Sequence, residues 1–374
     1  MCRDTNQSHA ALQAMKMPAD LIREEIRKSG AISFARFMEL ALYCPETGYY
    51  ESKKDIVGRG GDFVTSVSTG SLFGEMLAFQ FADWLKPLGD NVIIAEAGAH
   101  DGRLARDILG WLQANSPGIF EKLTYVLVEP SSRRRDWQRE TLAGFENQVQ
   151  WIAQLSELKK RQFVSGIIFS NELLDAFAVH RYGWSAAKRE WFEWGVALNA
   201  EQFCWTQIPL KSGASKLCPL ELEKVLPDGY VIETCPSAEA WWREAASVLT
   251  HGKLVAIDYG HAAGEEFSPA RIRGTLRAYY RHQVSDDLLA HPGEQDLTAH
   301  VNFAAIQAAG EAAGLRTEQF CTQPQFLTRI LQKAVAEQKF TRMDAKQVRQ
   351  FQTLTHPEHL GRAFRVLVQA RGAS

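Results

Sequence analysis

The chain has 374 residues, of which 45% are hydrophobic, and a formal net charge of −2 from 42 lysines and arginines against 44 aspartates and glutamates. This length and composition are typical of a globular protein with two domains, or with one large domain that carries insertions. The near-neutral balance provides no bulk field that would attract nucleic acid or an anionic membrane, so we expect neither as a partner.

Targeting and metal-binding signals are weak. No apolar stretch approaches the roughly 18 residues that a membrane span requires, and residues 1–8 lack a basic region followed by an apolar core. We therefore expect no membrane insertion and a cytoplasmic location. The six cysteines form no CxxC pair, and Pro357 interrupts the spacing of His356 and His359. The sequence therefore predicts no metal site.

The first part of the chain has apolar residues at helical spacing, in runs such as 34–42 and 72–85. Ser33 can cap the first of these runs. Glycines at 58–62 interrupt the pattern and predict a loop. We predict an N-terminal helical cap over residues 1–90 that lies against the ligand-binding edge of the sheet that follows.

Residues 91–102 predict a buried strand, a glycine loop and the start of a helix. Gly98 and Gly102 would let backbone N–H groups approach a ligand where side chains would block them. The dinucleotide fingerprint needs a glycine and a small residue where this chain has His100 and Arg103, so the pattern disfavours a nicotinamide or flavin cofactor.

The same loop fits a looser pattern, E-x-G-x-G-x-G, which is typical of S-adenosylmethionine (SAM) methyltransferases. Glu96 stands at its first position, and His100 replaces the middle glycine. A glycine-containing turn without any cofactor is the alternative at this point.

Two further apolar runs end in acids. The first leads to Glu129, which fits the carboxylate that accepts hydrogen bonds from ribose hydroxyls in Rossmann-like sheets. The second leads to Asn171, Glu172 and Asp175. Open α/β sheets bind ligands at the carboxyl ends of their strands, so we expect these side chains at a binding edge.

The second half of the chain alternates between the sheet and two insertions. Residues 179–232 predict short antiparallel strands rich in aromatics, which we interpret as an inserted subdomain. Residues 253–258 predict a return to the sheet. Residues 261–300 are polar and basic with little periodicity, which favours a loop-rich substrate arm. Closing strands are expected at 315–321 and 363–369.

Six motifs resemble the signatures of one family and occur in the family's order. They are Phe37–Tyr50, Gly61–Ser66, Asn171–Ala176, Asp258–Gly260, Gly274–His282 and Pro292–Val301. The chain resembles the MidA-like SAM-dependent methyltransferases. The resemblance implies an α/β fold with a Rossmann-like methyltransferase sheet in residues 91–374 and a terminal antiparallel hairpin.

The chain departs from the family pattern at two places. The family's loop resembles E-L-G-P-G-R-G, whereas residues 96–102 read E-A-G-A-H-D-G. The family's P-E-I-S after Ser66 is V-S-T-G here. Both departures concern the expected cofactor and substrate side of the fold.

The resemblance implies SAM as the cofactor, no metal, and methylation of an arginine side chain of a protein, with a respiratory complex I subunit as a candidate substrate. The expected cofactor-binding residues are Glu96, Gly98, His100, Gly102, Glu129, Asp62 and Thr65. Asp62 and Thr65 belong to a glycine-bounded loop that could close over the methionine end of SAM. Alternatively, Asp62 only stabilises its turn.

An arginine acceptor needs carboxylates, because its guanidinium is protonated and a poor nucleophile. Glu172 and Asp175 could bind the guanidinium and converge on one face if a helix begins near residue 172. Asn171 could add a hydrogen bond. These residues are our predicted catalytic set, and capping of that helix is the alternative role.

Two other functions stay open at this stage. The same fold could methylate a small molecule enclosed by the aromatic insertion. The chain could also be a SAM-binding assembly chaperone without chemistry, with a degenerate cofactor loop and an aromatic surface that binds a partner. The sequence predicts no oligomeric state.

Overall fold

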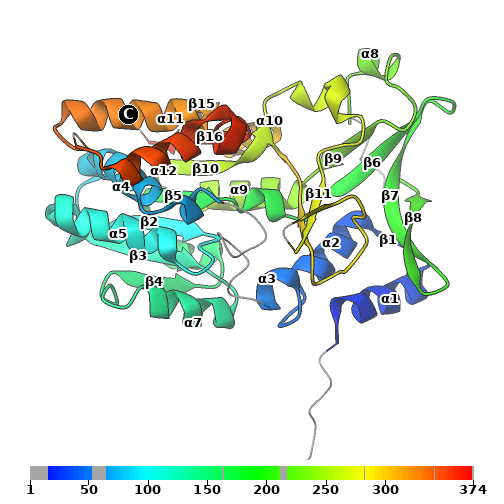
Figure 1. Cartoon of the computed structure of the whole chain (residues 1–374), viewed down its shortest axis with the longest axis horizontal. Helices are drawn as coiled ribbons and strands as arrows, with labels where there is room; N and C mark the ends of the chain where they lie inside the picture. Colours follow the sequence, from blue (N-terminus) through cyan, green and yellow to red (C-terminus); the bar gives the residue numbers. More distant parts are fainter. Residues whose placement is uncertain are drawn as a thin grey trace, which may run out of the picture.

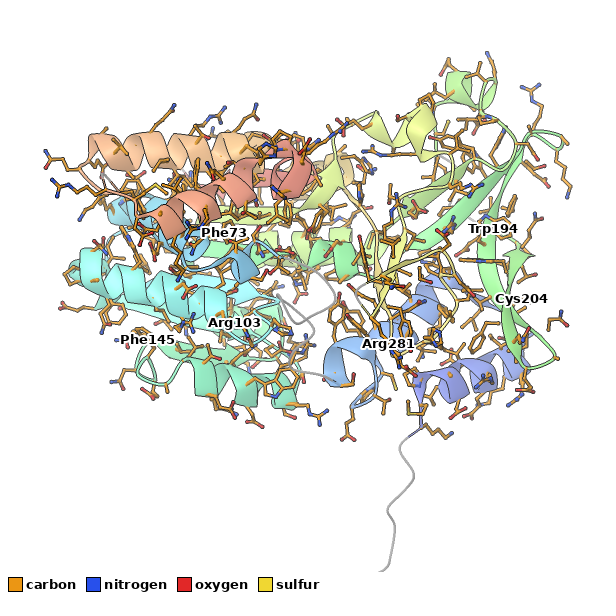
Figure 2. The ribbon with its side chains drawn as sticks, in the orientation of Figure 1. Phe73, Arg103, Phe145, Trp194, Cys204 and Arg281 are labelled. Atoms are coloured by element: carbon orange, nitrogen blue, oxygen red, sulfur yellow. The ribbon has the colours of Figure 1, made fainter. Side chains whose placement is uncertain are left out.

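The computed structural model describes residues 16–52, 65–161, 164–210, 217–281, 283–340 and 342–372. Two halves lie side by side (Figure 1): a mixed sheet with its helices in one, and an antiparallel sheet with the N-terminal helices in the other. Figure 2 shows the same halves through their side chains, with Phe73 and Arg103 in the first and Trp194 and Cys204 in the second.

The main sheet has the strand order β15-β16-β10-β5-β2-β3-β4, with β14 beside β10. Its parallel strands are β2 (Val92–Ala97), β3 (Leu123–Val128), β4 (Val149–Ile152), β5 (Ser165–Asn171), β10 (His251–His261) and β14 (Val301–Asn302). The antiparallel strands β15 (Arg316–Thr322) and β16 (Phe364–Arg371) complete it. The predicted α/β methyltransferase sheet and its closing hairpin are confirmed.

Helices cover both faces of this sheet. One face packs against α4 (Leu72–Leu85), α5 (Arg103–Asn115), α11 (Gln323–Ala336) and α12 (Ala345–Thr355). The other packs against α9 (Pro236–Val248), α10 (Phe303–Ala312) and the 3-10 helix η3 (Leu155–Lys160). All six residues of β2 are buried, as its continuous apolar run predicts for a strand covered on both faces.

The antiparallel sheet comes mainly from the predicted aromatic insertion. It contains β1 (Ile32–Ser33), β6 (His180–Ser185), β7 (Glu190–Asn199), β8 (Gln202–Ile208) and β9 (Val231–Thr234). The N-terminal helices α1 (Pro18–Ser29) and α2 (Phe34–Tyr43) pack on it, and Ser33 caps α2 by accepting a hydrogen bond from the Arg36 N–H.

The boundary expected at residue 90 does not coincide with a change in packing. Helix α4 lies in the same hydrophobic cluster as the main sheet, whereas α1 and α2 pack with the antiparallel sheet, which β1 joins by pairing with β7. Pairing between β1 and β7 connects segments more than 160 residues apart, so local periodicity could not indicate it.

The segment expected as a loop-rich arm contains three short strands, β11 (Arg277–Tyr280), β12 (Gln283–Ser285) and β13 (Asp296–Thr298). The remaining short helices are α3 (Tyr49–Ser52), α6 (Pro117–Phe120), α7 (Ser132–Thr141), α8 (Leu220–Glu223), η1 (Val67–Thr69), η2 (Lys86–Leu88), η4 (Leu174–Ala176), η5 (Glu265–Phe267), η6 (Pro269–Arg271) and the π-helix η7 (Pro357–Gly361). Within the described ranges, no helix has the length and apolarity to cross a bilayer.

Candidate active site

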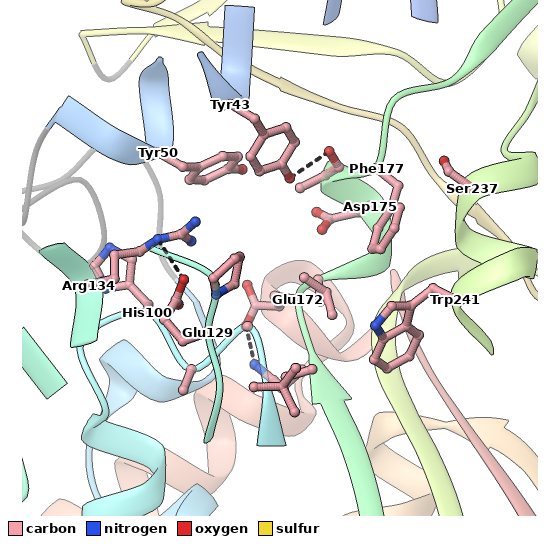
Figure 3. A pocket seen from close by; sticks show the side chains of 18 of the residues that line it. Tyr43, Tyr50, His100, Glu129, Arg134, Glu172, Asp175, Phe177, Ser237 and Trp241 are labelled. Carbon is pink, nitrogen blue, oxygen red and sulfur yellow. Dashed lines mark hydrogen bonds and ion pairs between the residues drawn. The ribbon is translucent and has the colours of Figure 1, made fainter. Parts of the chain in front are cut away.

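A cavity of about 770 Å³ lies at the carboxyl ends of β2, β3 and β5. The loops after these strands form one side of it. Residues of α2, α3 and α9 also line it, together with Thr65, Val67 and Ser68, the start of α5, Arg134 of α7 and residues 153–155 after β4. Figure 3 shows Tyr43 and Tyr50 on one side, Glu129 and Glu172 on the opposite side and Trp241 at the flank. The cavity is therefore shared between the two halves of the molecule.

The glycine loop after β2 forms part of the cavity wall. Gly98 has a φ of +79°, and a Cβ added there would lie 3.0 Å from a methyl group of Leu173. His100 has a φ of +47°, in the left-handed region that glycine adopts without steric cost, and it also lines the cavity. The replaced glycine therefore costs strain but keeps the backbone course of the loop.

Gly102 belongs to the same loop but is not among the described residues that line the cavity. A Cβ there would face Leu142 and Gln138 at 3.4–3.5 Å. Its φ of +85° and its place just before α5 make it the residue that turns the loop into the helix. These observations give Gly102 a role in shaping the loop, and its N–H donates to the Ala99 carbonyl at 2.8 Å. Its direct contact with a cofactor stays a prediction.

Four cavity-lining residues have a buried polar atom without a hydrogen-bond partner in the described part of the chain: Nε of Arg134, Oδ1 of Asn171, Nε2 of His100 and Oε2 of Glu172. The Arg134 atom lies 3.3 Å from the Glu129 carboxylate in an ion pair. Buried polar atoms normally have partners, so the remaining three favour a polar ligand in the cavity. Together with the close backbone approach at Gly98, they fit a cofactor that carries both polar and apolar parts.

Glu96 lies at the base of the cavity and is buried. The hydroxyl of Tyr125 donates a hydrogen bond to its Oε2 at 2.5 Å. Burial raises the pKa of Glu96 to about 7, and the bond from Tyr125 opposes part of that shift.

Glu129 follows β3 and is 1% exposed. Its carboxylate accepts hydrogen bonds from the Ser131 N–H at 2.9 Å and from Gln138 at 3.3 Å, and it lies 3.3 Å from the guanidinium of Arg134. Burial raises its pKa, and Arg134 opposes that shift. The position matches the predicted ribose-binding carboxylate, and Arg134, which sequence reasoning missed, holds it in place.

Glu172 follows β5 directly, and its backbone has a φ of +51°. Oε1 accepts hydrogen bonds from the Ser66 N–H at 3.0 Å and from the side-chain amide of Asn171 at 3.2 Å. Burial, and then the charge of Asp175, raise the pKa of Glu172 to about 8. This is the perturbed, cavity-facing acid that general principles associate with function.

The prediction that an α-helix begins near residue 172 is wrong. The chain passes from β5 through the short helix η4 into β6. The reason is the positive φ of Glu172 and the carboxylate of Asp258, which accepts the N–H groups of Leu173 at 3.1 Å and Leu174 at 2.8 Å. Both acids nevertheless line the cavity, so helical spacing is not what brings Glu172 and Asp175 together.

Asp175 is buried in an acidic neighbourhood. Burial, Asp258 and Asp296 together raise its pKa well above the ordinary value. Burial also raises the pKa of Asp258 to about 7. Asp258 is not among the cavity-lining residues that the structure describes, so its contact is with the loop that carries Glu172 rather than with a ligand.

Of the two residues predicted before Ser66, Thr65 is buried and lines the cavity. Asp62 lies outside the described residues.

Sequence reasoning missed two tyrosines of the cavity wall. Tyr43 donates a hydrogen bond to the carbonyl of Ala176 at 2.9 Å, Tyr50 donates one to Asp296 at 2.8 Å, and their rings stack at 5.6 Å. Both belong to the 37–50 motif. That motif indicated the family resemblance, but the spacing of its residues did not indicate a role for either tyrosine.

Known proteins resemble this chain in sequence and in structure. The model of a family described as S-adenosyl-L-methionine-dependent methyltransferases matches residues 76–321. A crystal structure from Burkholderia thailandensis bound to S-adenosyl-homocysteine is 32% identical, with a TM-score of 0.84, and the match covers 96% of this chain and 92% of that one. A second structure from the same organism is 31% identical, with a TM-score of 0.80 and the same coverage.

Curated relatives are more distant in sequence. "Protein arginine methyltransferase NDUFAF7, mitochondrial" of Mus musculus is 28% identical over 78% of this chain and 69% of its own length. The Drosophila melanogaster homologue of that protein is 26% identical over 95% of this chain and 85% of its own.

Proposed function

This chain belongs to the family of S-adenosyl-L-methionine-dependent methyltransferases, and we propose that it methylates an arginine side chain of a protein. When bound, the cofactor supplies an electrophilic methyl group on a sulfonium, and the accepting nitrogen gives up a proton as it takes that methyl. The residues of the chain then have to hold the acceptor, orient it and exclude water.

One observation supports an arginine acceptor above others. Glu172 and Asp175 both line the cofactor cavity with poorly solvated carboxylates, and the described part of the chain pairs neither of them with a lysine or arginine. Their raised pKa values mean that ionising them is costly until a cation arrives. A guanidinium is such a cation, and its planar fork matches carboxylates.

The tyrosines complete this acceptor site. Tyr43 and Tyr50 stack against each other on the cavity side opposite Glu172 (Figure 3). A cation over the face of a tyrosine gains electrostatic attraction. A guanidinium between these rings and the two carboxylates would be held on both sides, with one nitrogen left to face the methyl group.

The extent of the cavity favours a protein substrate. The cavity continues to Arg36 and Glu39 on α2 and to Ser237 and Glu244 on α9. The side chains of Arg36 and Glu39 are 41% and 55% exposed, so the cavity meets solvent there. A long side chain projecting from another protein could enter by this route. The names of the relatives, which are protein arginine methyltransferases, agree with such a substrate.

The finer assignments are also proposals. The family resemblance suggests a respiratory complex I subunit as the substrate. Cytoplasmic location stays a prediction, and cell fractionation would test it, since the named relatives are mitochondrial.

Mass spectrometry of arginine methylation in cells with and without this gene tests the proposal. We expect at least one arginine peptide to lose its methyl group in the deletion, to regain it with the wild-type gene, and not to regain it with Glu172→Gln. Methylation of a small molecule alone would replace the proposal with the small-molecule alternative. Failure of the purified chain to bind SAM in calorimetry would favour the chaperone alternative.

A further inference from the structure

The carboxylate of Glu172 is tied to the C-terminal helices by a chain of hydrogen bonds. Ser66 donates its backbone N–H to Glu172 Oε1 at 3.0 Å and its hydroxyl to Gln323 Oε1 at 3.2 Å. Gln323 in turn donates its amide to the carbonyl of Leu354 at 3.0 Å. Ser66 and Gln323 are both 0% exposed, so water does not compete for these bonds.

Gln323 is itself held firmly. It is the first residue of α11, directly after Thr322, which forms a reciprocal capping box with Gln325. Its partner, the Leu354 carbonyl, lies in the last turn of α12, where carbonyls lack helical partners. The Gln323 amide thus joins the start of one helix to the end of the other, and its oxygen is presented to Ser66.

The segment that carries Ser66 is rigid in its own right. The Thr65 N–H donates to the Ser68 hydroxyl at 2.9 Å, and Thr69 donates its hydroxyl to the Ser66 carbonyl at 2.8 Å. These bonds fix the shape of the segment, so the bond from the Ser66 hydroxyl to Gln323 helps to fix the direction of the Ser66 N–H as well.

The two oxygens of Glu172 then have different tasks. Oε1 accepts from Ser66 and Asn171, whereas Oε2 is buried without a hydrogen-bond partner among the described residues. With Oε1 occupied, rotation of the carboxylate is restricted and Oε2 is presented to the cavity. An N–H donor of an incoming guanidinium would find it there.

We propose that Gln323 is a positioning residue for the methyl-transfer site, which acts through Ser66 to orient the carboxylate of Glu172 and to favour its ionised form when the substrate cation binds. The role rests on the proposed function of Glu172. It makes the helical hairpin α11–α12 part of the active site, although Gln323 lies 257 residues after Ser66 in the sequence.

The charged and polar groups around Glu172 determine its pKa, which a titration would measure. Asp175 faces it from η4, Asp258 and Tyr259 face it from β10, and Asn171 lies beside it. Two of these groups are acids that oppose its ionisation, whereas the Ser66 N–H favours it. Misplacing that N–H should therefore raise the pKa of Glu172 further.

The test compares Gln323→Met, Ser66→Ala and the double variant. Each single variant removes the Ser66–Gln323 bond, and Ser66→Ala keeps the backbone N–H. Titration of the Glu172 carboxyl carbon by NMR, assigned by its loss in Glu172→Gln, should show a midpoint at higher pH by about half a pH unit or more. Both changes break the same hydrogen bond. The double variant should therefore shift the Glu172 midpoint no further than the single variant with the larger shift.

Activity gives a second measurement. At pH 7, kcat should fall about threefold or more in either single variant, as a shift of about half a pH unit or more in the Glu172 midpoint requires. It should recover toward the wild-type value at pH 9, with the SAM dissociation constant within about twofold of wild type. A merely structural defect would lower kcat equally at every pH.

Gln350→Met is the matched control. Gln350 is also a buried glutamine of the hairpin, but it accepts from the N–H of Leu72 at 3.1 Å, at the start of α4, and has no hydrogen bond to Ser66 or Glu172 among the described residues. This variant should lower the melting temperature without moving the titration of Glu172. An unmoved midpoint in Gln323→Met, or an equal movement in Gln350→Met, would overturn the proposal. Absence of methyl transfer by the wild-type chain would contradict the proposed function instead and leave the titration as the test.

Discussion

Two glutamates line the same cavity after strands on either side of β2, and the charges around them are opposite. Glu129 lies 3.3 Å from the guanidinium of Arg134, which also pairs with Glu51 of α3. Glu172 has acids as its charged neighbours, Asp175 foremost. The cofactor half of the cavity thus contains its own cation. No lysine or arginine among the described residues pairs with the acids of the acceptor half, so these acids ionise readily only when a cationic substrate arrives.

Gly98→Val should have the largest effect, because it fills the cofactor half of the cavity. A side chain there would press on Leu173 and strain a backbone with a φ of +79°. We expect no detectable SAM binding in calorimetry, with the circular dichroism spectrum preserved. Gly89→Val is the matched control, since Gly89 has the same φ but nothing within 4 Å of its added Cβ. Equal loss in both variants would assign the effect to backbone strain.

Glu172→Gln should distinguish the acceptor half of the cavity from the cofactor half most clearly. It keeps the shape of the side chain but removes the charge that holds a guanidinium, so kcat should fall about 100-fold or more while SAM affinity stays near normal. Asp175→Asn should behave in the same way. If SAM affinity fell as far as kcat in both variants, these acids would belong to the cofactor half.

Glu129→Gln should give the reverse pattern. Loss of a charged acceptor for ribose hydroxyls should cost about 1–3 kcal/mol of SAM binding, roughly 5- to 150-fold in affinity. Turnover at saturating SAM should change much less. A cofactor analogue without ribose hydroxyls provides the check: wild type and variant should bind it equally, and a persisting difference would exclude the ribose contact.

The smallest expected effect is on stability. The folded pKa of Glu172, about 8, lies above its ordinary value of 4.5. Its contribution to stability is therefore fully present below about pH 4.5 and is lost as the pH rises through about 8. The melting temperature of Glu172→Gln relative to wild type should accordingly rise between pH 5 and 9. Glu157→Gln should show no such rise, because the pKa of exposed Glu157 is lowered.

The cofactor half was the more predictable one. Glu96, Gly98 and Glu129 were expected from strand ends and a glycine loop, because hydrophobic periodicity is local and parallel strands present their carboxyl ends at one edge. All three line the cavity. What the local pattern could not show was that Gly102 faces Gln138 and Leu142 instead.

The acceptor half depends on contacts that sequence spacing does not contain. Tyr50 meets Asp296 across 246 residues, and Leu174 meets Asp258 across 84. The helix expected at Glu172 failed for this reason: a distant carboxylate provides acceptors for the local N–H groups and holds a non-helical backbone. Tertiary contacts of this kind override local propensity.

The place of β16 in the main sheet has a consequence for synthesis. It is the last strand in sequence, yet it lies between β10 and β15 and contributes Val366 and Leu367 to the fully buried core. A ribosome needs roughly 5 to 20 s to extend the chain from the end of β10 to the end of β16. During that time β10 presents an unpaired apolar edge, which is a template for aggregation. The yield of this enzyme in cells should therefore depend on chaperones that shield nascent chains, even when the finished fold is stable.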